Sequence, residues 1–173
     1  MLRRVFSRFT MQTLPMISRT YLTPLMDYAV QAWSPWLKRD VELLDRIIRR
    51  ATKMVRELRH LPYEQRMKST DMLDFTRRRM KADLVLVYRI LSDSQHPLRS
   101  MFIVRKVRTR RSNSRQLVGQ RTRLNCRRQF FAVRVCFLWN RLPEHVVCSE
   151  SERNFKHKLD TYIREFIPLE IES

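Results

Sequence analysis

Glycine is almost absent from this chain of 173 residues, in which Gly119 is the single example. About a dozen glycines would be ordinary at this length. Tight β-hairpins depend on glycine or Asn-Gly pairs to reach positive φ. The scarcity therefore disfavours a hairpin-rich β fold and favours helices joined by proline and polar breaks. It also excludes a glycine-rich loop of the kind that cradles nucleotide phosphates.

Metal-ligating residues are few and scattered. The three cysteines contain no CxxC pair, which disfavours a disulfide framework and predicts a reducing, non-secretory compartment. The histidine spacings match no metal motif, and His145 with Cys136 and Cys148 is the only arguable ligand cluster. We therefore expect no metal site and no cofactor. The residues concerned are Cys126, Cys136, Cys148, His60, His96, His145 and His157.

Paired catalytic carboxylates are also missing. Two-metal nucleotidyl transfer needs acids that hold ions about 4 Å apart, yet the sequence has no adjacent Asp pair. The nearest pair, Asp71 and Asp74, lies where a helix is expected to begin, and capping is the better interpretation. The sequence thus predicts a chain that is not an enzyme by itself. No apolar run reaches the ~18 residues that would span a membrane.

Positive charge is what the chain has in excess. There are 36 Lys and Arg against 17 Asp and Glu, for a formal net charge of +19. Between Asp93 and Glu144 there is no acid but there are thirteen Lys or Arg. Such an excess usually has an anionic partner, most often nucleic acid. Arginine predominates, and its planar fork matches phosphate oxygens. The hydrophobic fraction of 43% is still sufficient for a core.

Helical periodicity runs through most of the chain. The patterns predict a helix over 17–33, kinked or started by Pro24, and a second helix opened by Ser34-Pro35 and running to Val55. A third long helix is predicted over 71–91. In the second helix an apolar stripe is expected to face the core: Val41, Leu44, Ile48, Ala51 and Val55, broadened by Ile47 and Met54.

Two of these helices also carry basic clusters. Arg46, Arg49, Arg50 and Lys53 recur at helical spacing opposite the apolar stripe. Either a solvated face or an anion-binding face fits that row. The second cluster, at the start of the 71–91 helix, comprises Arg77, Arg78, Arg79 and Lys81. Cations near a helix N-terminus oppose the macrodipole, so this cluster suggests an external anion.

Residues 99–126 are polar, arginine-rich and without apolar periodicity, and are predicted to form a flexible linker that contacts a phosphate backbone. A nuclear-targeting patch is the other interpretation of "RKVRTRR". The candidate contact residues are Arg105, Lys106, Arg108, Arg110, Arg111, Arg121 and Arg123.

The segment 127–143 fits either a strand or a helix, and we favour the helix, with Phe131, Val135, Leu138 and Leu142 on its apolar side. Its basic residues Arg127, Arg128 and Arg134 complete the candidate nucleic-acid contacts. A capping box, Ser149-x-x-Glu152, is expected to open a last helix that ends at Pro168. The fold prediction is therefore mainly α: a small helical bundle over 1–98, the basic linker, and a C-terminal helical segment over 127–168.

Several stretches occur together in one known setting. "YLTPLMDYAVQAWSPWLKRDVELLDRIIRRATKMV", "LPYEQRMK", "RRRMKADLVLVYRIL", "RTRLNCRRQFFAVRVCFLWNRLPEHVV" and "FKHKLDTYI" follow in this order. From about residue 2 to 164, the chain resembles the region C-terminal to the polymerase palm in reverse transcriptases of non-LTR (LINE-type, jockey-like) retrotransposons. That region comprises the helical thumb and a basic C-terminal segment.

The resemblance implies a nucleic-acid-binding role without catalysis. In the family, the "ADD"-type metal-binding motif of this RNA-directed DNA polymerase lies upstream of this region, and no such motif occurs here. The acid-free first 26 residues fit a mitochondrial presequence by composition, but the resemblance favours a continuation of the polymerase. Two departures concern turns: the family's glycine in "RRxRGDL" is Ala82 here, and "STDMLDF" replaces a glycine-containing turn.

The leading hypothesis is a retroelement-derived fragment that binds RNA or an RNA–DNA duplex without sequence preference, in the nucleus or cytoplasm. The alternatives are a protein-interaction module, for instance one that docks onto an intact polymerase through apolar helix faces, and a translated remnant without function. The tryptophans Trp33, Trp36 and Trp139 could stack on bases, but core packing is the better expectation for each.

Overall fold

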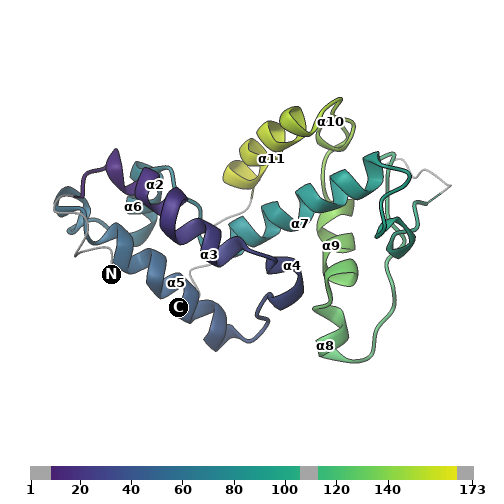
Figure 1. Ribbon diagram of the computed structural model, residues 1–173, viewed down its shortest axis with the longest axis horizontal. Helices are drawn as coiled ribbons and strands as arrows, with labels where there is room; N and C mark the ends of the chain where they lie inside the picture. The colour runs from purple at the N-terminus through teal and green to yellow at the C-terminus, as the bar shows by residue number, and fades with distance from the viewer. Residues whose placement is uncertain (1–8, 106–112, 167–173) are drawn as a thin grey trace. The chain divides into compact units, whose positions relative to one another are not determined.

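The computed structural model describes residues 9–105 and 113–166. The described chain is mainly helical, which confirms the predicted fold class (Figure 1). An isolated antiparallel bridge joins Val104 to Leu117. Four predicted contact residues, Lys106, Arg108, Arg110 and Arg111, lie outside the described residues.

The chain divides into two compact units between Arg78 and Arg79. This division differs from the predicted boundaries near residues 98 and 126. The dividing point falls within helix α7 (Phe75–Ser92), because the later residues of that helix, such as Leu84 and Val87, belong to the core of the second unit.

The first unit begins with four short helical pieces where the sequence predicted one helix. Pro24 lies in the first turn of α3, as expected for a residue that lacks an N–H. A second break follows because Ala29 adopts a left-handed conformation with φ of 48°. The pieces are α2 (Thr13–Ile17), the π-helical turn η1 (Ser18–Leu22), α3 (Thr23–Asp27) and α4 (Val30–Trp33).

Helix α5 (Lys38–Thr52) provides much of the core of the first unit. Ile48, Ala51 and Val55 are buried, as the apolar stripe predicted, whereas Ile47 is exposed. The predicted start at Ser34-Pro35 was wrong, because the helix begins at Lys38 without a side-chain cap. A 3-10 turn, η2 (Arg56–Leu58), and the helix α6 (Tyr63–Thr70) complete this unit before α7.

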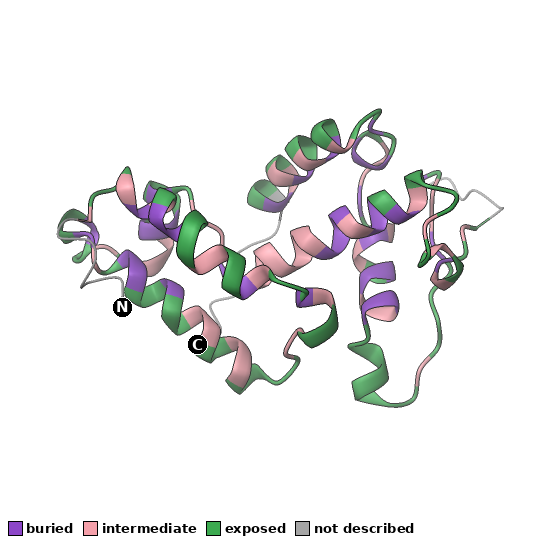
Figure 2. Cartoon of the chain, viewed as in Figure 1, coloured by how far each residue is buried: buried purple, intermediate pink, exposed green. Residues whose placement is uncertain are grey.

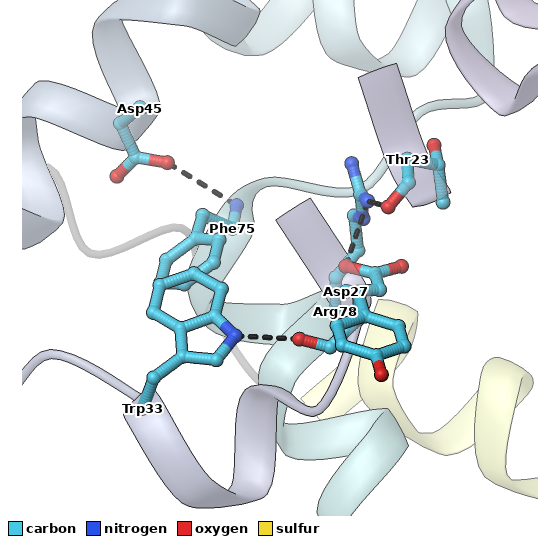
Figure 3. A network of polar contacts seen from close by, with 7 residues as sticks. Thr23, Asp27, Trp33, Asp45, Phe75 and Arg78 are labelled. Carbon is cyan, nitrogen blue, oxygen red and sulfur yellow. Dashed lines mark hydrogen bonds and ion pairs between the residues drawn. The ribbon is translucent and has the colours of Figure 1, made fainter. Parts of the chain in front are cut away.

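Acidic side chains organise the N-terminus of α7. The Asp74 Oδ1 accepts a hydrogen bond from the backbone N–H of Arg77 at 2.8 Å, and the Asp45 Oδ1 accepts one from the N–H of Phe75 at 3.2 Å. Capping is thus the role of Asp74, as predicted. Asp71 instead adopts a left-handed conformation at the end of α6. Figure 3 shows Asp45 directed at Phe75, whose ring stacks on Trp33 at 6.0 Å.

The second unit packs the later part of α7 with α9 (Phe131–Asn140) and α11 (Glu152–Phe166), and also contains η3 (Arg99–Met101), α8 (Asn125–Arg128) and α10 (Glu144–Val147). The helix preferred for 127–143 is confirmed, although it is split near Phe130. Trp139 is fully buried, as expected of a core residue, whereas Trp33 and Trp36 are exposed, so the core prediction was wrong for those two. The ring of Phe155 lies 4.4 Å from that of Tyr88 and 5.9 Å from that of Trp139.

The described ends of the predicted flexible linker are ordered against this core. Phe102 and Leu117 are buried, and the side chain of Asn140 forms hydrogen bonds of 2.8 and 2.9 Å with the backbone N–H and C=O of Leu117. The side-chain amide of Asn113 donates to the carbonyl oxygens of Trp139 and Leu142. The sequence analysis did not predict this order because it was based on the charge of the segment. A few apolar residues and asparagine amides are enough to fix the backbone.

The capping box predicted at Ser149 was misplaced by two residues. Helix α11 begins at Glu152, and the Oγ of Ser151 accepts the N–H of Asn154 at 3.2 Å. Ser149 is buried, and its carbonyl accepts the hydroxyl of Tyr88. Hydrogen bonds from Arg89 and then Lys156 lower the pKa of Glu152 to about 2. The Glu152 carboxylate therefore binds the side chains of Arg89 and Lys156 and does not act in the predicted capping box.

Candidate nucleic-acid interface

The basic row on α5 is exposed. Arg46, Arg49, Arg50 and Lys53 all lie on the solvent side, opposite the buried Ile48. None of the four forms an ion pair with a residue in the described ranges. We call these four residues, with Arg39, the α5 basic face.

Arg39 was missed by the sequence analysis. It is exposed and precedes Arg46 by seven residues, so two turns of helix place both on one side. The charge pattern could have identified it by that spacing. From Arg39 to Lys53 the face extends about 21 Å at 1.5 Å per residue. Exposed Glu42 also lies on this side and Asp45 lies one turn before Arg49, so the cations outnumber the carboxylates along this face.

The guanidinium group of Arg49 is held in place by Tyr63. Its Cζ lies 4.6 Å from the centre of the Tyr63 ring, and the Cζ of Arg66 lies 5.7 Å from it. Burial is the main cause that raises the pKa of the Tyr63 hydroxyl, followed by the nearby charge of Asp45. The ring therefore stays neutral, and its attraction for arginine persists throughout the working range of pH.

The second predicted cluster has intramolecular partners. Arg78 Nη2 lies 2.8 Å from the Asp27 Oδ1, a pair visible in Figure 3, and Lys81 Nζ lies 2.6 Å from the Asp160 Oδ1. Arg77 Nε lies 3.6 Å from the Asp74 Oδ2. Acids within each unit thus compensate these cations.

Arg79 belongs with them, because its charge helps to lower the pKa of Asp83. These partners account for the cluster without an external anion, and a contact between these cations and an anion stays a prediction. The sequence could not show which acids, up to 79 residues away, would reach these cations.

Arg134 is part of the core of the second unit. Its Nε and Nη2 form a two-pronged contact of 2.8 and 3.0 Å with the carboxylate of Asp83, whose side chain is 1% exposed. Burial raises the pKa of Asp83 despite the lowering effect of Arg134. This guanidinium group is occupied, and Arg134 therefore does not join the candidate interface.

The remaining predicted cations of the second unit are exposed. The set comprises Arg105, Arg121, Arg123, Arg127 and Arg128, and Figure 2 shows α8 in the exposed colour. Sequence reasoning did not select the exposed rings of Phe130 and Phe137 or the exposed Arg141 beside them. Arg141 Cζ lies 5.3 Å from the centre of the Phe137 ring.

Other kinds of site find little support. Among the described residues, no three His, Cys, Asp or Glu side chains are grouped so that they could hold a metal ion. None of the helices in ranges 9–105 and 113–166 is both long and apolar enough to cross a membrane. Exposed cations that lack acidic partners are the distinguishing feature.

No family model, curated protein or solved structure matches this chain.

Proposed function

We propose that this chain binds the sugar–phosphate backbone of RNA or an RNA–DNA duplex without sequence preference and without catalysing a reaction on it. The resemblance to the thumb and C-terminal segment of non-LTR retrotransposon reverse transcriptases supports the same role. On this proposal the chain is a retroelement-derived fragment that acts in the nucleus or cytoplasm.

The α5 basic face is the observation that carries this proposal. Its cations are exposed and lack ion-pair partners among the described residues, whereas those on α7 have such partners. A row about 21 Å long can meet several phosphates, since successive phosphates of one strand are about 3.4 Å apart along a duplex axis. Contacts of this kind position a duplex and carry little sequence information.

The salt dependence of binding tests the proposal. If about six phosphates are neutralised, log affinity for a duplex should fall against log salt with a slope near −5. Fluorescence anisotropy with a labelled RNA–DNA hybrid at about 50 to 200 mM salt measures that slope. Two hybrids of unrelated sequence should give the same affinity within about threefold. A slope near zero, or no binding at low salt, contradicts the proposal.

A second candidate function, docking onto a protein such as an intact polymerase, is favoured by exposed apolar side chains in the first unit. Leu25 is 79% and Tyr28 81% exposed, and grouped exposed apolar residues usually indicate an interaction surface.

Changing Leu25 and Tyr28 to Ser should abolish self-association or capture of the polymerase, without altering the salt slope. Light scattering after gel filtration, at two salt concentrations, measures the mass of the chain and of any complex with the polymerase. An unchanged mass and unchanged capture would contradict docking through these residues.

A further inference from the structure

Two exposed phenylalanines, one just before α9 and one within it, are each paired with an arginine. Phe130, immediately before the helix, is 41% exposed, and Phe137 is 64% exposed. Arg127 Cζ lies 4.7 Å from the centre of the Phe130 ring, and Arg141 Cζ lies 5.3 Å from the centre of the Phe137 ring. We call these four residues the Arg–Phe pairs; all belong to the second unit.

Both rings lie at the exposed surface of this part of the chain. Phe130 and Phe137 are seven residues apart, which is two turns or about 10 Å along the axis. A nucleic-acid strand with stacked bases rises about 3.4 Å per nucleotide, so the two rings are separated by about three nucleotides. Phe131 and Val135 lie between them in sequence but are buried, which shows that the pairs belong to the outer face.

The surrounding charge favours a polyanion over a protein as the occupant. The nearest acids along the chain are Asp93 and Glu144, and of the thirteen cations between them Arg134 is paired with Asp83. Arg127 and Arg141 are exposed, and each can contact a phosphate while it remains over its ring. Aromatic rings beside arginines are the usual elements of single-strand recognition, because every base has a face to stack.

We propose that Phe130 and Phe137 stack on unpaired bases of single-stranded nucleic acid while Arg127 and Arg141 contact the flanking phosphates. In a duplex the bases are stacked and paired, so the rings cannot reach them without opening the helix. The Arg–Phe pairs thus add a single-strand site to the backbone contacts of the α5 basic face. This inference rests on the proposed function, since both require a nucleic-acid ligand.

The test compares three labelled probes by fluorescence anisotropy: an oligothymidylate, an abasic oligomer of the same length, and an RNA–DNA hybrid. Phe137→Ala should weaken oligothymidylate binding about tenfold or more, and Phe130→Ala by a similar factor. Neither change should weaken binding to the abasic oligomer or the hybrid. Because both rings are exposed, the variants should remain folded by circular dichroism.

Two further variants separate stacking from simple apolar contact. Phe137→Trp should retain the affinity for oligothymidylate, whereas Phe137→Leu, which keeps an apolar side chain, should lose it as Phe137→Ala does. Met16→Ala, at an exposed apolar position of the first unit, is the matched control and should leave all three affinities unchanged.

The outcomes distinguish this inference from the proposed function. Unchanged oligothymidylate binding by Phe130→Ala and Phe137→Ala, with intact hybrid binding, overturns the stacking site and leaves the proposed function in place. Unchanged binding together with a loss of self-association would assign the rings to a protein interface and also overturn it. A wild-type chain that binds none of the probes overturns both proposals.

Discussion

A chain with Arg46, Arg49, Arg50 and Lys53 all changed to Glu should bind an RNA–DNA hybrid on the order of 10²–10³-fold more weakly at low salt. The salt slope should also become shallower by about four, because each phosphate contact contributes nearly one unit. The reason is geometric: these side chains are exposed on one helix face and have no ion-pair partner among the described residues.

Two controls make this result specific. Changing Arg19, Lys68, Arg153 and Lys158 to Glu, all exposed, alters the net charge equally without touching the α5 basic face. That control should lose much less affinity. Since Arg49 and Arg50 lie in the last turn of α5, where Glu opposes the macrodipole, a version with Gln at the four positions checks folding. Equal losses in the two Glu variants would mean that net charge, not this face, governs binding.

The exposed row on α5 could be predicted from the sequence, whereas the fate of the other cations could not. Helical spacing alone places Arg46 and Arg50 opposite Ile48, and the structure agrees. Whether Arg78 or Arg134 is free depends on acids 51 residues away, Asp27 and Asp83. Periodicity contains no information about such distant pairs. The sequence analysis therefore assigned these arginines to a basic surface, although acids from distant parts of the chain neutralise them in the folded structure.

The fold shows the same limit. Apolar stripes identified most of the buried side of α5 and α9, although Ile47 is exposed, because a stripe must be covered wherever its helix packs. The sequence analysis did not predict the order around Leu117, since it depends on one hydrogen bond that Asn140 accepts, one that it donates and one buried leucine, none of which produces a periodic pattern.

Arg134→Ala should destabilise the second unit by about 3–5 kcal/mol, the usual cost of leaving one charge of a buried pair without its partner. The Asp83 carboxylate is almost fully buried and receives two of its hydrogen bonds from this guanidinium. Arg134 also donates to the carbonyl of Gln129 at 2.7 Å, at the break between α8 and α9. Chemical denaturation followed by circular dichroism measures the loss.

The pH dependence of this loss identifies its cause. Burial already raises the pKa of Asp83 above the ordinary aspartate value, and the hydrogen bond and charge of Arg134 counteract that effect. Without Arg134 the pKa should rise further, so the folded variant binds its proton more tightly than the unfolded chain does. Its stability, low at neutral pH, should therefore recover as the pH falls through the raised pKa toward the ordinary aspartate value. The double variant Arg134→Ala with Asp83→Asn should lose most of this dependence and recover part of the stability. If the loss is instead the same at every pH, packing of the arginine stem is responsible and the buried charge is not.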